Sequence, residues 1–259
     1  MSACYDEEQL DFSEPLFARV PLTIVLTMWN SSRRPQYMQQ LLEFRPTSRV
    51  IVLHNHGFER CQKQNVNHSA LDLWHANVYA ASLAAGGPAL ILEDDVQFLP
   101  RIREAAANIE QFLLSQSMPC AYNLGCCPFL SLPHRQHTRV VFGADAHAVL
   151  YNASALQRFP RISIRWLHDL ELYRHLRTFT CKRPCAVQHK SATDNSAVYN
   201  VLGLPLLFYA ALGRGCAVTY YERVHCTARA GGLLPTTLAI LVVLVSAIRR
   251  VTYTPGIAT

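Results

Sequence analysis

The sequence predicts an α/β fold, with a sheet of mainly parallel strands that is flanked by helices. Three observations support this class. Strand and helix patterns alternate over the first hundred residues, as they do where parallel strands are joined by helices. The expected strands are almost continuously apolar, which is typical of strands covered on both faces. Half of the 259 residues are apolar, so the chain can bury a sizeable core.

The first two strands are expected at residues 19–29, RVPLTIVLTMW, and at residues 49–54, RVIVLH. Between them the polar turn NSSRRPQ leads into a short helix at residues 36–44. The second strand ends in the polar loop NHGFERCQKQN. Both strands therefore end in segments that are rich in polar and charged side chains.

A helix is expected to begin near Ser69, where Ser69 and Asp72 resemble a capping box. Apolar residues then recur at helical spacing, at Leu71, Trp74, Val78, Ala81 and Ala85. Residues 86–88, GGP, end this helix, and residues 89–92 form the third strand.

The second half of the chain is less regular. We expect helices at residues 101–117, 154–159 and 169–179, and short strands at residues 121–124, 139–142, 146–151 and 185–188.

The chain is expected to carry a membrane anchor near its end. Residues 230–248 hold no charged side chain, are followed by Arg249 and Arg250, and would span about 28 Å as a helix, close to the thickness of a bilayer core. A buried helix is the alternative. The acidic segment 1–18 lacks the basic and apolar regions of a signal peptide, so we expect a single C-terminal anchor and a cytosolic domain. The expected division is thus 1–18, a domain at 19–200, an apolar and basic connection at 201–229, the anchor at 230–248 and a tail at 249–259.

Charge and cysteine content narrow the classes of function. Lys and Arg number 24 against 18 Asp and Glu, a modest excess that suits a phosphate-bearing substrate or an anionic membrane surface. No dense Lys/Arg run accompanies it, so a nucleic-acid partner is not expected. The nine cysteines are an odd number and predict no closed disulfide framework. We expect most of them to be buried as small apolar residues.

Three consecutive carboxylates, Glu93, Asp94 and Asp95, end the third expected strand in the stretch ALILEDDVQF. Burial without partners would be very costly, so solvent, basic residues or a metal ion must accompany them. Glu93 and Asp95 project to the same side of a strand, and carboxylates of this kind hold Mg²⁺ together with substrate phosphates. Asp94 projects to the other side, toward a ribose or a basic residue. A solvated turn or a helix cap is the alternative reading.

Four segments in order, TIVLTMWNSSRRPQ, SALDLWHANVYAASLAAGG, LILEDDVQF and FGADAHAVLYNASALQRF, resemble glycosyltransferase family 25, the lipopolysaccharide and procollagen galactosyltransferase group. The resemblance covers about residues 20–195. It implies a GT-A-like, Rossmann-type mixed sheet flanked by helices, and transfer of a hexose from a nucleotide-sugar to a glycan or glycoprotein. UDP-hexose is the expected donor, and Mn²⁺ or Mg²⁺ the expected cofactor.

The same resemblance assigns roles on the donor side. Glu93 and Asp95 would bind the metal ion, with His189 as a third ligand. Trp29 would stack on the base, although a tryptophan at a strand end is often a core residue. The remaining donor contacts would come from Asp94 and from the cationic residues Arg33, Arg34 and Lys63, for which ordinary surface charge is the alternative.

On the acceptor side, the stretch RWLHDLELYRHL provides the expected general base, Asp169, with Glu171 as the second choice. Acids in a first helical turn also simply stabilise the helix. Trp166 would form a sugar platform, and Asp145 would contact acceptor hydroxyls. We expect His147 to be structural.

Two other functions remain open. The first is a catalytically inactive, membrane-anchored GT-A-like module that binds a glycan or a protein. The second is a metal-dependent phosphoryl- or nucleotidyl-transfer enzyme, which the absence of a Walker-type glycine-rich loop disfavours.

Overall fold

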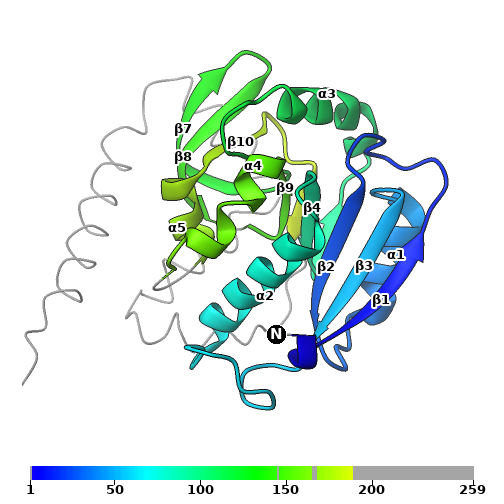
Figure 1. The fold of residues 1–259 in the computed structure, drawn as a ribbon. Coiled ribbons are helices and arrows are strands. Elements are labelled where there is room, and N and C mark those ends of the chain that lie inside the picture. The colour runs from blue at the N-terminus through cyan, green and yellow to red at the C-terminus, as the bar shows by residue number, and fades with distance from the viewer. Residues whose placement is uncertain (1, 145, 165–167, 189–259) are drawn as a thin grey trace, which may run out of the picture.

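A computed structural model describes residues 2–144, 146–164 and 168–188 of the chain (Figure 1). Within these ranges, nine strands form one mixed sheet in the order β1-β3-β2-β4-β9-β6-β10-β8-β7, and a small second sheet pairs β5 with β11. The strands of the large sheet are β1 Tyr5–Asp11, β2 Leu22–Met28, β3 Arg49–Asn55, β4 Ala89–Glu93, β6 Cys120–Asn123, β7 Cys127–His134, β8 His137–Ala144, β9 Ala148–Tyr151 and β10 Arg177–Cys181. Those of the small sheet are β5 Val96–Phe98 and β11 Ala186–Gln188.

The helices are α1 Arg34–Phe44, α2 Ser69–Leu83, α3 Ile102–Leu114, α4 Ala153–Leu156 and α5 His168–His175, with short 3₁₀ turns η1 Ser2–Cys4 and η2 Phe159–Arg161. They form two layers because the side chains of each buried strand alternate between the faces of the sheet. In β4, Leu90 and Leu92 pack in a core with α1 and α3, whereas Ala89 and Ile91 pack on the opposite face with α2, α4 and α5. The α/β architecture expected from the sequence is confirmed, but the sheet is mixed and not mainly parallel: in the described ranges, three of its strand pairs are parallel and five are antiparallel.

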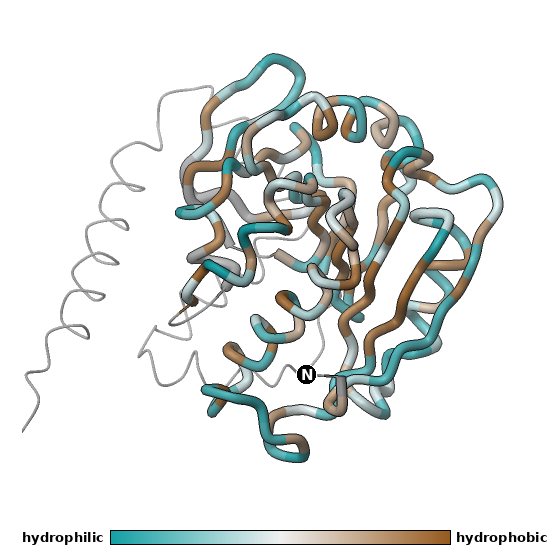
Figure 2. Tube along the Cα trace, viewed as in Figure 1, coloured by the Kyte–Doolittle hydropathy of each residue, from teal (hydrophilic) through white to brown (hydrophobic). Residues whose placement is uncertain are grey.

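The parallel strands β3, β2 and β4 are largely apolar (Figure 2). β2 is parallel to both β3 and β4, and six of its seven residues are buried. β4 then pairs antiparallel with β9, and β9 pairs antiparallel with β6. The parallel strands β3, β2 and β4 therefore present their carboxyl ends at one edge, and the mixed half of the sheet begins beside them.

The acidic N-terminal segment belongs to the same sheet. β1 pairs antiparallel with β3 from Tyr5 opposite Asn55 to Asp11 opposite Arg49. Only Tyr5 of this strand is buried, Glu8 and Leu10 are partly exposed, and Asp6, Glu7 and Asp11 are exposed. Charged side chains on an edge strand keep it from pairing with other chains. The domain therefore includes residues before the boundary expected at residue 19, because β1 is one of its strands.

Other sequence expectations need correction. The helix expected at residues 169–179 ends at His175, and residues from Arg177 onward form β10, which pairs with β6 and β8. β7 was not expected at all. The cap of α2 is His68, whose side chain accepts a hydrogen bond from the backbone N–H of Leu71, and Asp72 is buried instead of capping the helix.

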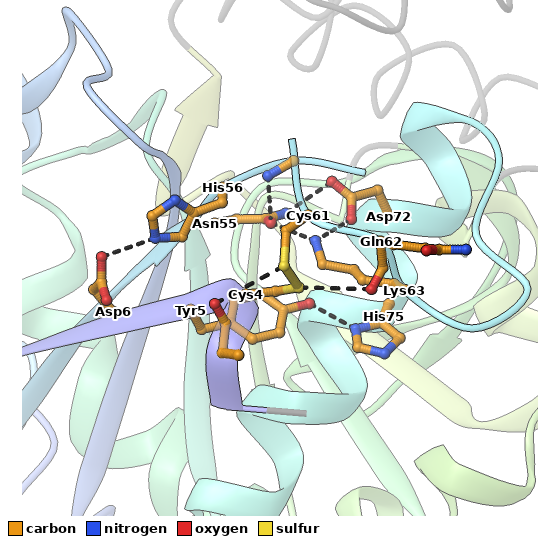
Figure 3. The surroundings of a disulfide bond; sticks show 12 residues. Cys4, Tyr5, Asp6, Asn55, His56, Cys61, Gln62, Lys63, Asp72 and His75 are labelled. Carbon is orange, nitrogen blue, oxygen red and sulfur yellow. Dashed lines mark hydrogen bonds and ion pairs between the residues drawn. A yellow bond between two sulfur atoms is a disulfide. The ribbon is translucent and has the colours of Figure 1, made fainter. Parts of the chain in front are cut away.

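A disulfide bond joins Cys4 to Cys61, across a sequence separation of 57 residues (Figure 3). It ties the segment before β1 to the loop after β3, and the odd number of cysteines had not predicted it. Cys120, Cys181 and Cys185 are buried free thiols, as expected of small apolar residues, and Cys126 is buried as well.

None of the helices in the described ranges has the length and apolarity needed to cross a bilayer. The expected anchor at residues 230–248, the connection at 201–229 and the tail at 249–259 lie outside those ranges. The membrane anchor therefore stays a prediction.

Candidate functional site

The candidate site lies at the shared carboxyl edge of β3, β2 and β4. From β2 the chain runs through α1, on one face of the sheet, to β3. It returns through α2, on the other face, to β4 on the far side of β2 (Figure 1). In open α/β sheets, ligands bind outside the carboxyl ends of strands at such a reversal of connection. Glu93 ends β4 at this edge, Asp94 and Asp95 follow it, and residues 29–33 follow β2.

Asp94 joins the end of β4 to the loop after β2. Its Oδ2 accepts hydrogen bonds from Thr27 Oγ1 and Ser31 Oγ, each at 2.7 Å, and its Oδ1 accepts one from Arg33 Nη1 at 2.7 Å. The carboxylate is buried, yet three donors and one positive charge compensate it. Of the two partners expected from the sequence, a ribose or a basic residue, the structure supplies the basic residue.

Asp95 is also buried, but only one of its oxygens is satisfied. Oδ2 accepts a hydrogen bond of 2.9 Å from Gln188 Nε2 and lies 3.6 Å from Arg33 Nη1. Oδ1 is inaccessible and has no hydrogen-bond partner among the described residues. Burial raises the pKa of Asp95, because removal from water disfavours the charged form. A buried carboxylate oxygen without a donor is costly, and it is the kind of hard ligand that Mg²⁺ and Mn²⁺ prefer.

Glu93, the last residue of β4, is partly exposed, and its backbone N–H donates to the carbonyl of His147 at 2.8 Å. Within the described ranges, no three His, Cys, Asp or Glu side chains lie close enough together to hold a metal ion. An ion at Asp95 would thus need ligands from elsewhere, such as substrate phosphates or His189. His189 follows Gln188 in the sequence but lies outside the described ranges.

Arg33 is the cation at the centre of this cluster. Burial opposes its charge, but the hydrogen bond to Asp94 and the charges of Asp94, Asp95 and Glu93 outweigh burial, so the pKa of Arg33 is raised. Its side chain is 25% exposed, which leaves part of the guanidinium group within reach of solvent. Arg33 is therefore a permanently charged group beside the carboxylates, where a diphosphate would lie if Asp95 held a metal ion.

Trp29, directly after β2, is 40% exposed. Its ring stacks on the imidazole of His56, with centroids 4.7 Å apart and planes 15° apart. It also meets His54 edge-on at 6.0 Å. Trp29 is thus not a core residue. It is an accessible aromatic surface at the same edge as the carboxylates.

Arg34 and Lys63 are both engaged in ion pairs within the protein. Arg34 donates through both terminal nitrogens to Glu8, at 2.6 and 2.7 Å, and this hydrogen-bonded pair lowers the pKa of Glu8 to about 2. Lys63 is buried, pairs with Asp72 and donates to Asn55 Oδ1 at 2.5 Å (Figure 3). Both cations are therefore bound to partners within the protein and have no role in the proposed function.

The expected acceptor side is only partly described. α5 begins at His168, so Asp169 and Glu171 lie in its first turn, and the helix packs against α2 and β8. Asp145 and Trp166 fall outside the described ranges. The roles of all four residues stay predictions.

His147 was expected from the sequence to have a structural role. It is fully buried, neither ring nitrogen has a hydrogen-bond partner in the described part of the chain, and burial lowers its pKa to about 4. It precedes β9 beside Glu93, and its Nε2 would lie 3.0 Å from a Cβ added at Gly125. That added carbon would also collide with the carbonyl oxygen of Ala186, so Gly125 allows β11 to pass. No local pattern could have revealed the unpaired ring.

Comparison with known proteins gives similarities of fold. A crystal structure of a glycosyltransferase involved in the glycosylation of the major capsid of PBCV-1 has a TM-score of 0.41 and 11% identity, over 71% of this chain and 100% of that chain. A197 from STIV has a TM-score of 0.41 and 10% identity, over 68% and 87% of the two chains. An apo UDP-glucose pyrophosphorylase has a TM-score of 0.36 and 6% identity, over 62% and 72%.

No family model matches the chain, and neither does any curated protein. The comparisons give no support to family 25 in particular. The likeness concerns the arrangement of the fold alone, and the case for a function rests on the site itself.

Proposed function

We propose that this protein is a metal-dependent glycosyltransferase that moves a hexose from a nucleotide-sugar, UDP-hexose, to a hydroxyl group of a glycan or glycoprotein. The observation that carries the proposal is the buried oxygen Oδ1 of Asp95, which has no hydrogen-bond partner among the described residues and lies at the carboxyl edge of the parallel strands. Trp29, exposed at the same edge, supports a nucleotide as the ligand.

In the proposed complex, Asp95 and Glu93 bind Mn²⁺ or Mg²⁺, with His189 as a further ligand. The ion would neutralise the departing diphosphate. Arg33 lies against the same phosphates and adds a positive charge that stays in place, because Asp94 holds it. Trp29 stacks on the base. Trp29 and Arg33 follow β2, Glu93 ends β4 and Asp95 follows it, so a single edge of the sheet positions these four residues.

The acceptor half of the reaction is proposed from the sequence. Asp169, or failing it Glu171, takes the proton of the acceptor hydroxyl as a general base, and the anomeric centre is inverted. Trp166 and Asp145 contact the acceptor. We also propose membrane attachment through residues 230–248, which the charge-free composition of that segment supports.

The test uses the full-length protein in detergent and a panel of nucleotide-sugars, with binding measured by calorimetry and turnover by release of the nucleotide. We expect one donor to bind in Mn²⁺ and to lose most of its affinity in EDTA or in Asp95→Asn. Asp11→Asn, an exposed change on β1, is the matched control. A folded protein that binds none of the donors in Mn²⁺ would overturn the proposal.

The alternative is a catalytically inactive binding module with the same fold. The ion pair of Arg33 with Asp94 favours it, since that pair compensates one carboxylate without any metal. Binding of a donor without turnover, unaffected by EDTA, would select this alternative.

A further inference from the structure

The aromatic surface at Trp29 is supported from one side by two histidines. The indole ring lies flat on the imidazole of His56, at 4.7 Å and 15°, and is edge-on to His54, at 6.0 Å and 78°. His54 belongs to β3, and His56 begins the loop after it. The orientation of the exposed indole therefore depends on side chains that do not belong to its own strand.

Both histidines are held by acidic residues of β1. His56 Nε2 lies 2.8 Å from Asp6 Oδ2, and His54 Nε2 lies 3.3 Å from Glu8 Oε2. A carboxylate on one ring nitrogen of an imidazole fixes the orientation of the ring. The chain of contacts thus runs from Asp6 through His56 to Trp29, and from Glu8 through His54 to Trp29.

The backbone of the N-terminal segment holds the same loop. The N–H of His56 donates to the carbonyl of Cys4 at 3.1 Å, and Cys4 is bonded to Cys61. The N–H of Cys61 in turn donates to the carbonyl of Gly57 at 2.9 Å. Figure 3 shows Asp6, His56 and the disulfide grouped around the start of β1. The loop from His56 to Cys61 is therefore attached to the N-terminal segment at both of its ends.

Without the disulfide, the position of the loop from His56 to Cys61 would depend on the edge strand β1 and on the turn η1 before it. Chain ends and edge strands open more readily than central strands unless something ties them down. The bond holds Cys4 against the loop, and with it the carbonyl that binds His56 and the strand that carries Asp6.

We propose that the N-terminal segment, residues 2–8, is part of the nucleotide site: Asp6 positions His56 behind Trp29, and the Cys4–Cys61 disulfide keeps this support in place, so that loss of either weakens binding of the nucleobase. The inference rests on the proposed function, because it takes the ligand to be a nucleotide. Asp6 and His56 are positioning residues here and do not touch the ligand.

Reduction of the bond is a simple chemical step. A trialkylphosphine attacks one sulfur of the Cys4–Cys61 bond, water supplies the oxygen of the resulting phosphine oxide, and two thiols remain. The free cysteines of the described part of the chain are already reduced and undergo no such change.

The experiment compares two ligands that differ in the base. Full-length protein is titrated with UDP and with inorganic pyrophosphate, each in Mn²⁺, for the wild type, Asp6→Asn, His56→Gln, the double variant Cys4→Ser/Cys61→Ser, and the wild type treated with phosphine. Asp11→Asn is the control on the same strand. We expect the Kd for UDP to rise about tenfold in the variants and after reduction, a typical effect of losing a stacked base. The Kd for pyrophosphate should stay unchanged, because only the base contact is altered.

The two ligands separate positioning from general damage. Circular dichroism checks that each variant is folded, and the Asp6→Asn and His56→Gln variants keep the disulfide if the serine variant is unstable. Equal loss of UDP and pyrophosphate would show a purely structural role and overturn the inference. Unchanged UDP binding in all variants would overturn it and leave the proposed function intact. A wild type that binds neither ligand in Mn²⁺ would overturn the proposed function, and this inference with it.

Discussion

At the scale of single residues, burial of the Asp95 carboxyl group carries a free-energy cost in the metal-free protein. Its Oδ1 is buried and has no donor in the part of the chain that the structure describes, and burial raises the pKa of the carboxyl group. A carboxyl group whose pKa is raised by folding binds protons more readily in the folded state than in the unfolded state. Its contribution to stability is therefore present at low pH and is lost as the pH rises through the folded-state pKa.

This sign leads to a prediction about Asp95→Asn. In metal-free protein at pH 7 we expect the variant to be more stable than the wild type by about 1 kcal/mol, because the amide carries no charge to bury. The difference should shrink as the pH falls and Asp95 takes up its proton. Urea denaturation in EDTA at several pH values measures both effects. A variant that is less stable than the wild type at pH 7 would mean that Oδ1 already has a donor in the free protein.

A second residue-scale prediction concerns His147, whose two ring nitrogens are buried without partners in the described part of the chain. Replacing an unsatisfied polar group by an apolar one of similar volume removes the desolvation cost. We expect His147→Leu to raise the free energy of unfolding by about 1 kcal/mol. Denaturant titration measures the change, with Val149→Ala, a buried position in β9, as a destabilising reference. A clear loss of stability in His147→Leu would reveal a hidden partner, such as a buried water molecule.

At the scale of elements, the site depends on the joint between β4 and the loop after β2. Asp94 accepts from Thr27, Ser31 and Arg33, so a single carboxylate from one strand holds the loop of its neighbour. In the proposed function, Trp29 of this loop stacks on the base and Arg33 provides a positive charge beside the phosphates. Their relative positions are therefore a property of the pair of elements.

We accordingly expect Asp94→Ala to cost about 3 kcal/mol of stability, since it leaves a half-buried guanidinium group and two hydroxyls without their acceptor. The effect should be much larger than that of Asp11→Ala, where the carboxylate is exposed. Thermal or urea denaturation of the two variants gives the comparison. Similar small losses in both would show that solvent compensates Arg33 as well as Asp94 does.

At the scale of the whole molecule, the disulfide between Cys4 and Cys61 closes a loop of the chain that contains β1, β2, α1 and β3. In the chain-entropy description, a closed loop of this length stabilises a fold by about 4 kcal/mol. This bond is at odds with the cytosolic location that the sequence predicts, because cytosolic thiols are kept reduced.

We expect Cys4→Ser/Cys61→Ser to lower the free energy of unfolding by about 2–4 kcal/mol and to unfold at lower temperature. Phosphine treatment of the wild type should reproduce the same shift, and Cys120→Ser serves as a control for the loss of a buried cysteine. Identical melting of reduced and oxidised protein would mean that the pairing of β1 with β3 suffices to hold the N-terminal segment.

The sequence by itself determined the parallel core and the place of the carboxylates. The strands at residues 19–29, 49–54 and 89–92 and the helix from Ser69 were all predicted. A buried strand is recognised by a short continuous apolar run, and a helix by apolar residues at helical spacing, so both are visible in consecutive residues. The position of residues 93–95 at a strand end follows from the same local pattern.

Only the tertiary structure decided what each charged group does. It pairs Arg34 with Glu8, Lys63 with Asp72 and Arg33 with Asp94. Among residues 2–144, 146–164 and 168–188, it gives one oxygen of Asp95 no donor. It also turns residues from Arg177 onward into a strand, draws the acidic N-terminal segment into the sheet and brings Cys4 to Cys61. The physical reason is the same in each case: these outcomes depend on contacts between residues far apart in the chain, and no local period records such contacts.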